Sequence, residues 1–168
     1  MRNQTIPKPR GHWIVVERTP RLPTNLAAEV TILGAILLDN AAHAEAAEKL
    51  TEDDFSLDSH RRIFLHMTEL INTGHAVDIV TLAESMSKHE IGKPSEIVQV
   101  GGVAYLASLT EGLPRRPVIR EYIAIVKEKS KLRKIMQACQ DASHKAETES
   151  YSASAIVTAL GVDLRGIK

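Results

Sequence analysis

Three groups of polar side chains in the sequence are of types that could carry chemistry. The run KEKSKLRK at residues 127–134 places five basic residues in eight positions, a density typical of contact with phosphate groups. Asp53 and Asp54 are neighbouring carboxylates, as found in acid–base catalysis. Seven histidines are spread over the chain, and imidazole is a common metal ligand. The spacing within each group decides which of these chemistries it supports.

The spacing argues against a metal centre and against catalysis. No HExxH motif occurs, and no two histidines lie four positions apart. His60 and His66 are six apart, which places them on different faces of a helix. The single cysteine, Cys139, excludes an intrachain disulfide and a Cys-based zinc site. Asp53 and Asp54 precede a predicted helix, where carboxylates normally stabilise the first turn. We therefore expect no catalytic residue, no metal ligand and no cofactor.

Nucleotide-binding motifs are also absent from the sequence. A phosphate-binding loop needs GxxxxGK[ST], so that backbone amides surround the phosphates and the lysine reaches them. The only Gly-Lys pair is Gly92-Lys93, which is followed by Pro94 and has no glycine five positions before it. No GxGxxG follows a predicted strand, so a dinucleotide site is not expected either. The sequence thus predicts that the chain is not an enzyme by itself.

The basic run has two interpretations. In the first, nucleic acid contacts its cationic side chains, which are Lys127, Lys129, Lys131, Arg133 and Lys134. In the second, the run is a solvated helix face whose long side chains cover apolar neighbours. No aromatic residue interleaves with the run for base stacking, and 21 basic residues balance 21 acidic ones over the whole chain. We favour the second interpretation and expect contact with nucleic acid to be indirect at most.

The elements that carry these residues are predicted to be helices. Between residues 25 and 114, apolar residues recur at spacings of three and four, interrupted by turn and capping signals at Asn72-Thr-Gly74, Asp78 and Gly101-Gly102. The last of these opens a helix that carries Val103, Leu106 and Leu109. We expect an all-α fold with a small head of about five to six helices over residues 25–114. Its expected core residues are Leu26, Val30, Leu33, Phe64, Met67, Leu82 and Leu106.

Gly34 interrupts the most apolar of these helices. A glycine in a helix interior costs about 1 kcal/mol relative to alanine, whereas burying Leu26, Val30, Leu33 and Leu37 contributes roughly 1.5–3 kcal/mol each. The packing contribution is much larger, so the glycine is tolerated where a neighbouring helix must approach closely. We predict that Gly34 is such a packing notch.

The region before the head differs in composition. Residues 1–24 contain four of the seven prolines and five basic residues against one acidic residue, which predicts a flexible basic N-terminal arm. The arm lacks the apolar run of a signal peptide, and no segment of the chain is long and apolar enough to suggest a membrane span. We expect a cytoplasmic protein without membrane contact.

Residues 115–168 are predicted to form a helical hairpin. A long helix begins at Pro117 and reaches about residue 149, and a short return helix covers Ser152 to Leu160. Along the long helix, apolar residues and Lys129 follow a heptad spacing. This stripe has two interpretations: it packs on the chain's own core or on the return helix, or it mediates self-association. The return helix is too short to cover all of it, so we favour self-association. We call its contact residues the seam: Tyr122, Ile125, Leu132, Met136 and Cys139.

Five segments in a fixed order resemble the N-terminal domain of the bacterial replicative DNA helicase (DnaB-type) family. They are LPTNLAAEVTILGAILLDN (22–40), LTEDDFSLDSHRRIFLHMTEL (50–70), VDIVTLAESM (77–86), GGVAYLASLTEGLP (101–114) and IREYIAIVKEKSKLRKI (119–135). The resemblance implies a helical head followed by a hairpin, with hairpins pairing into dimers and a hexamer built as a trimer of dimers. It also implies primase and helicase loader as partners.

The chain departs from the family pattern at three places. LPRRP (113–117) stands where the family usually has a polar linker, and the second hairpin arm, YSASAIVTALGVDLRGIK, is shorter and less acidic than is usual. The ATPase domain of the family is not in this sequence. We expect a non-catalytic assembly and partner-docking domain of a replicative helicase. The alternatives are a free-standing adaptor or inhibitor of a helicase ring without a motor, and a small helical DNA-binding protein.

Overall fold

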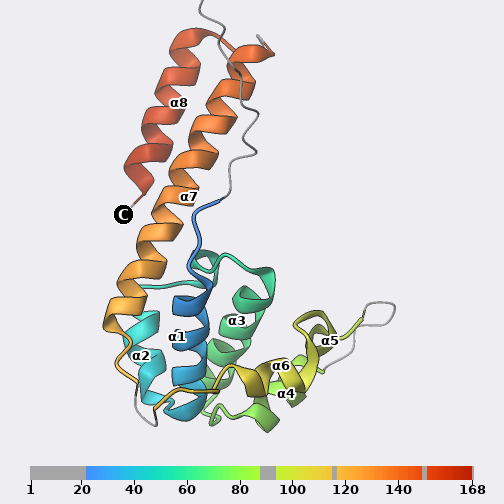
Figure 1. The fold of residues 1–168 in the computed structure, drawn as a ribbon. Coiled ribbons are helices and arrows are strands. Elements are labelled where there is room, and N and C mark those ends of the chain that lie inside the picture. The colour runs from blue at the N-terminus through green and yellow to red at the C-terminus, as the bar shows by residue number, and fades with distance from the viewer. Residues whose placement is uncertain (1–21, 88–93, 115–116, 149–150, 168) are drawn as a thin grey trace, which may run out of the picture.

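The computed structural model describes residues 22–87, 94–114, 117–148 and 151–167, and in these ranges the chain is entirely helical (Figure 1). The all-α expectation is therefore confirmed, whereas residues 1–21 of the expected basic arm lie outside the described ranges. None of the described helices is long and apolar enough to cross a bilayer. The elements are α1 (Leu26–Leu38), α2 (Ala41–Ala47), η1 (Glu52–Asp54, a single 3-10 turn), α3 (Asp58–Asn72), α4 (Ile79–Met86), α5 (Glu96–Gln99), α6 (Gly102–Ser108), α7 (Arg120–Glu147) and α8 (Ala153–Gly166).

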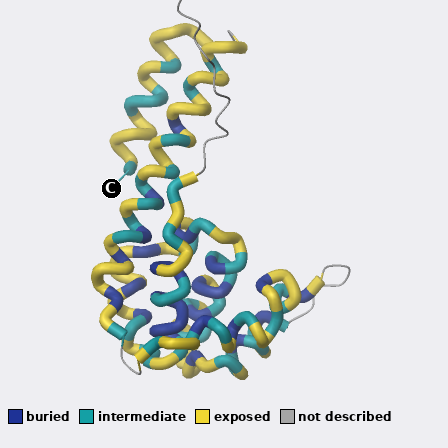
Figure 2. The backbone as a smooth tube through the Cα atoms, viewed as in Figure 1, coloured by how far each residue is buried: buried dark blue, intermediate teal, exposed yellow. Residues whose placement is uncertain are grey.

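The helices form a globular head from which a hairpin projects (Figure 1). The head consists of α1 to α6, with α1 between α2, α3 and α7. The first half of α7 packs on the head, and its second half runs beyond the head beside α8. Buried residues concentrate in the head and at the base of α7, while the outer hairpin is mostly half-buried or exposed (Figure 2).

The apolar helix α1 forms the centre of the head. Asn25 caps its N-terminus by accepting a hydrogen bond from the backbone N–H of Ala28 at 3.1 Å. Its buried face is centred on Ile32, Leu33 and Ile36. The expectation that Leu26 belongs to the core is wrong, because it is the first residue of α1, lies at the edge of the packed region and is 44% exposed.

Gly34 is the packing notch that the sequence predicts. A Cβ atom placed on Gly34 would lie 2.0 Å from the carbonyl oxygen of Leu109 and 2.6 Å from Cδ1 of Leu113. Leu109 is the C-terminal cap of α6, so the end of α6 approaches the backbone of α1 at this position. Only a residue without a side chain permits this approach.

The other sequence signals of the head are largely confirmed. Asp78 caps α4 by accepting hydrogen bonds from the N–H groups of Val80 and Thr81, both at 2.8 Å. Gly74 follows α3 with a φ of 78°, a left-handed conformation that favours glycine. Val103 is 52% exposed because it lies in the first turn of α6, before that helix reaches the core. Five predicted core residues are buried: Leu33, Phe64, Met67, Leu82 and Leu106.

The two hairpin helices differ in their bounds from the predicted ones. Ile119 is the N-terminal cap of α7, so Pro117 precedes the helix and does not begin it. Ser152, the predicted first residue of the return helix, is the N-terminal cap of α8, with its hydroxyl accepting a hydrogen bond from the N–H of Ala155 at 3.3 Å. The helix then continues to Gly166, six residues past the predicted end, because Gly161 is accommodated in its interior.

Candidate interaction surface on the long helix

The face of α7 that packs on the head is a stripe next to the predicted seam. Its buried residues are Ile119, Ile123, Val126 and Ser130, which repeat at spacings of four, three and four. Each lies one position after a residue of the predicted heptad pattern. α7 thus carries two adjacent stripes with the same period, and the head covers the second of them.

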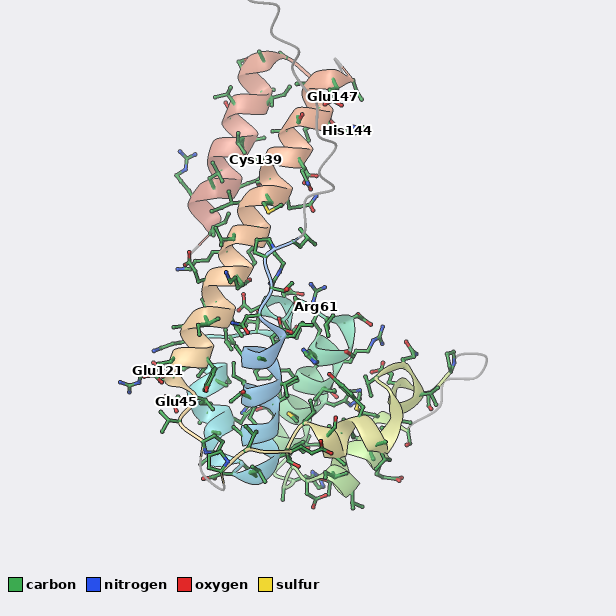
Figure 3. All side chains as sticks on the ribbon, in the orientation of Figure 1. Glu45, Arg61, Glu121, Cys139, His144 and Glu147 are labelled. Carbon is green, nitrogen blue, oxygen red and sulfur yellow. The ribbon has the colours of Figure 1, made fainter. Side chains whose placement is uncertain are left out.

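The seam residues remain partly uncovered within a single copy. Tyr122 and Leu132 are each 37% exposed, and Cys139 is exposed. Ile125 and Met136 are half-buried. Cys139 lies on the part of α7 that runs beyond the head (Figure 3). The core of the head packs against Ile125, so in a single copy the apolar stripe on α7 is covered in part and otherwise left exposed.

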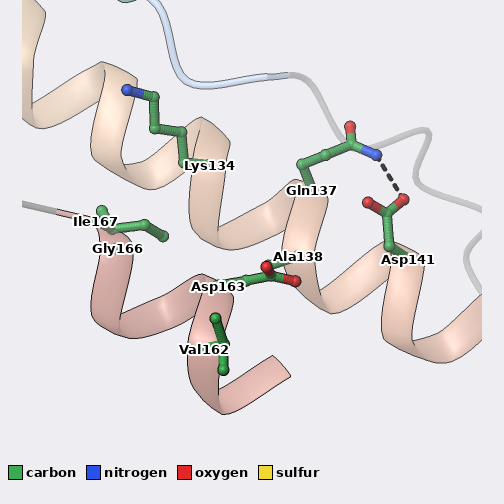
Figure 4. Close-up of a pocket in the computed structure, with 8 residues that line it drawn as sticks. All are labelled: Lys134, Gln137, Ala138, Asp141, Val162, Asp163, Gly166 and Ile167. Carbon is green, nitrogen blue, oxygen red and sulfur yellow. Dashed lines mark hydrogen bonds between the residues drawn. The ribbon is translucent and has the colours of Figure 1, made fainter. Parts of the chain in front are cut away.

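The return helix α8 packs against a different side of α7. Ala138 is buried there, and the two helices border a groove of about 530 Å³ lined by residues of both (Figure 4). Gln137 and Asp141, at the edge of this groove, are joined by a hydrogen bond of 2.7 Å. At roughly 100° per residue, Met136 lies about 200° around the helix axis from Ala138. The seam thus faces away from α8.

Further apolar side chains extend the exposed surface of the hairpin. Ile135 on α7 is 40% exposed, and Val157 and Leu164 on α8 are 70% and 40% exposed. Exposed apolar surface of this kind marks contact sites in proteins. Ile135 was not predicted because it lies outside the heptad pattern. Leu164 was not predicted because it lies beyond the predicted end of the return helix.

A buried carboxylate joins the head to the base of the hairpin. Asp54, in η1, is fully buried and accepts hydrogen bonds from the hydroxyl of Ser130 at 2.6 Å and from Nζ of Lys127 at 2.9 Å. Nζ of Lys134 lies 3.4 Å from the same carboxylate. The guanidinium of Arg133 donates to the carbonyl of Asp54 at 2.6 Å. We call these five residues the Asp54 junction.

The junction accounts for a large part of the basic run. Lys127, Arg133 and Lys134, three of the five residues considered for nucleic-acid contact, bind the head, and Arg133 also donates to the carbonyl of Pro23 at 2.9 Å. Lys129 and Lys131 are half-buried on α7. Nucleic-acid contact through this run stays a prediction, whereas these bonds give three of its five basic residues a structural role.

A second buried polar network lies inside the head. Glu29 on α1 is buried, and its carboxylate is 2.6 Å from Nδ1 of His60 and accepts hydrogen bonds from the N–H and hydroxyl of Ser56 at 2.9 and 2.5 Å. The other ring nitrogen of His60 lies 2.6 Å from the hydroxyl of Tyr105. The one signal for this network in the sequence is Glu29, an acidic residue inside the mostly apolar segment of α1.

Both buried carboxylates have depressed pKa values. Burial alone would raise the pKa of Asp54, but hydrogen bonds from Ser130, from the N–H of Thr51 and from Lys127 hold it below its ordinary value of 3.8. Burial likewise opposes ionisation of Glu29, and the bonds from His60 and Ser56 hold its pKa below 4.5.

We expect the protein to lose stability in acid because of these two groups. A carboxyl whose pKa is lower in the folded than in the unfolded state contributes stability above its unfolded pKa, and this contribution disappears as the pH falls through the folded pKa. The midpoint of thermal unfolding should therefore change little between about pH 7 and 5 and fall below about pH 4. Melting curves followed by circular dichroism measure this. A midpoint independent of pH down to about 3 would contradict it.

Comparison with known proteins agrees with this architecture. The model of the family described as "DnaB-like helicase N terminal domain" matches residues 21–128. The replicative DNA helicase DnaB of Buchnera aphidicola subsp. Baizongia pistaciae is 38% identical over 122 residues, which cover 73% of this chain and 25% of that protein. DnaB of Geobacillus stearothermophilus is 36% identical over 121 residues, covering 72% and 25%. The chain thus spans about a quarter of the length of these curated relatives.

Two solved structures share the fold. The crystal structure of the N-terminal domain of DnaB helicase from Mycobacterium tuberculosis superimposes with a TM-score of 0.78 at 26% identity, covering 88% of this chain and all of that one. A structure described as a DnaB-like replicative helicase and its interactions with primase superimposes with a TM-score of 0.65 at 21% identity, covering 86% and 32%. The second likeness is one of fold alone.

Proposed function

Because the chain belongs to the DnaB-like helicase N-terminal domain family, we propose that it is the assembly and docking domain of a replicative DNA helicase. In this proposal it acts in the cytoplasm and is not an enzyme by itself. Residues 1–24 form a basic arm, residues 25–114 the head and residues 115–168 the hairpin. Copies pair through their hairpins, and three such pairs form a hexameric collar. Primase and the helicase loader dock on this collar.

The observation that carries the pairing is the incomplete cover of the seam. The head buries one stripe of α7 and α8 packs against another side, so that Tyr122 and Leu132 are left 37% exposed. In a lone copy this apolar area stays in contact with water. Complete burial of a fully exposed leucine-sized side chain contributes roughly 1.5–3 kcal/mol, and a two-fold contact would supply the fraction that belongs to the still exposed part of each seam residue, once in each copy. The hairpin is therefore better stabilised in a pair than alone.

Charge placed on the seam is expected to separate the copies without unfolding them. In the double variant Leu132→Glu/Met136→Glu, pairing would bury four carboxylates in an apolar contact, so the dimer dissociation constant should rise on the order of 100-fold or more. Neither position lies in the fully buried core, so the helix content should persist. Sedimentation velocity over a concentration series measures the assembly, and circular dichroism measures the fold.

A matched control separates the seam from apolar surface in general. Val80 and Val98 are 76% and 67% exposed on the head, so Val80→Glu/Val98→Glu makes the same chemical change away from the hairpin. This variant should keep hairpin pairing. Equal assembly of the parent and the seam variant would refute pairing through the seam.

A further inference from the structure

A second groove lies at the base of α7, where α8 no longer accompanies it. It encloses about 460 Å³, within the range of roughly 300–1,000 Å³ usual for ligand pockets. Four cationic side chains line it: Lys49, from the segment after α2, and Arg120, Lys127 and Lys131 on α7. At roughly 100° per residue, these α7 residues lie on the same side of the helix as Ala138, which contacts α8, and opposite the seam. The groove continues the path of α8 toward the head.

The groove has an excess of positive charge in a chain whose net charge is zero. Glu128 is the one carboxylate among its described lining residues. Asp54 neutralises Lys127 at 2.9 Å, and Glu45 lies 3.7 Å from Arg120 in a contact that is open to solvent. Lys49 and Lys131 contribute two further positive charges to the groove, and Lys49 is exposed. An occupant with negative charge is therefore favoured.

The floor of the groove is apolar. Ile123, which is 2% exposed, and the exposed Ala124 lie between the cationic side chains. No aromatic residue is present among the described lining residues to stack on a base, and a phosphate backbone has no apolar group to place on Ile123 and Ala124. Carboxylates flanking an apolar side chain match the lining better than a nucleic acid does. The chemistry thus points to an acidic protein segment.

The length of the uncovered part of α7 indicates the form of this segment. α7 has 28 residues and α8 has 14, so at 1.5 Å per residue α8 accompanies only about half of α7. The groove spans Arg120 to Lys131, or roughly 17 Å, which is about three turns of helix. A helix lying there would continue the line of α8 along α7. An amphipathic helix in a groove is a common form of peptide recognition.

We propose that this groove docks an acidic amphipathic helix of a partner protein. An apolar side chain of that helix packs on Ile123 and Ala124, and its carboxylates pair with Lys49, Arg120 and Lys131. The inference rests on the docking role in the proposed function but not on pairing through the seam, which lies on the opposite side of α7. The two therefore succeed or fail separately.

The test uses a fluorescein-labelled helical peptide of about 12 residues with leucines on one face and glutamates on both flanks. At low salt we expect fluorescence anisotropy to show saturable binding of the peptide. Its affinity should fall at least about 10-fold in Lys49→Glu/Lys131→Glu, and it should also fall when salt is added. Lys129→Glu, which reverses a charge on the same helix outside the groove, should bind like the parent. Amide resonances of Ala124 and Lys131 should shift on titration. The charge-reversed variant should also sediment like the parent.

Three results would overturn the proposal. They are no binding of the peptide, equal binding by the parent and the charge-reversed variant, and binding of the same peptide with its glutamates replaced by lysines. Stronger binding of a single-stranded oligonucleotide that is lost in Lys49→Glu/Lys131→Glu would assign the groove to nucleic acid instead. A seam variant that no longer pairs but still binds the peptide would show that docking and assembly are separate.

Discussion

Replacing Asp54 with alanine is expected to lower the free energy of unfolding by about 3 kcal/mol, the lower end of the effect of breaking a buried ion pair. The carboxylate is fully buried between η1 and α7 and accepts bonds from Ser130 and Lys127. Lys127, at 30% exposure, can turn toward water after the change, but Ser130 at 1% exposure cannot. An unpaired hydroxyl and an empty space would remain in the contact between head and hairpin.

Urea denaturation measures this loss, and the neighbouring residue provides the control. Asp53 is exposed, so Asp53→Ala removes the same carboxylate without disturbing a buried contact and should change stability by less than about 0.5 kcal/mol. Asp54→Asn keeps one acceptor oxygen but loses the charge, so it should lie between the two. Equal stability of the Asp53 and Asp54 alanine variants would show that the junction contributes nothing.

Gly34→Ala is expected to destabilise the protein by about 3 kcal/mol or more, opposite in sign to its effect in an isolated helix. Helix propensity alone favours alanine by about 1 kcal/mol. The new methyl group, however, would lie 2.0 Å from the carbonyl oxygen of Leu109 and 2.9 Å from its carbonyl carbon, and both are backbone atoms. A backbone cannot rotate out of the way as a side chain can, so α6 must move off α1.

Gly161→Ala is the matched control for this prediction. Gly161 is also inside a helix, but the nearest atoms to an added methyl group are the guanidinium nitrogens of Arg165 at 3.9 Å. Helix propensity should then act alone, and we expect stability to rise by up to about 1 kcal/mol. Thermal and urea unfolding should therefore show a loss of stability for Gly34→Ala and a gain for Gly161→Ala. A stabilising Gly34→Ala would disprove the close approach of α6.

Local signals in the sequence were sufficient to predict the helices and the notch. Asp78 caps a helix because its carboxylate accepts hydrogen bonds from free N–H groups two and three residues later, and a contact this local can be predicted from the sequence. Gly34 was predictable because a glycine in an apolar helix conflicts with propensity, and such a conflict needs a packing reason. Family membership was predictable from five segments in order.

The identity of the buried stripe on α7 was not predictable in the same way. Two stripes on α7, offset by one residue, have the same period. The head buries the stripe that contains Ser130 and not the one that contains Lys129. A serine can be buried against Asp54, whereas a lysine would need its charge paired. Asp54 lies 76 residues before Ser130, so no spacing rule relates them. The polar partners that determine which stripe of α7 is buried are distant in the sequence and meet only in the folded chain.

The continuity of α7 has a mechanical consequence. One unbroken helix begins beside the head and extends past Ser130 for another 17 residues, or roughly 26 Å, so any rotation about its contact with Asp54, taken as the pivot, would be magnified at its far end. A rotation of about 10° at that pivot would move the far end by about 4–5 Å, which is close to one helical turn. In the proposed pair, a small adjustment of a few bonds at the base would therefore displace the outer hairpin of one copy by nearly a helical turn against that of the other.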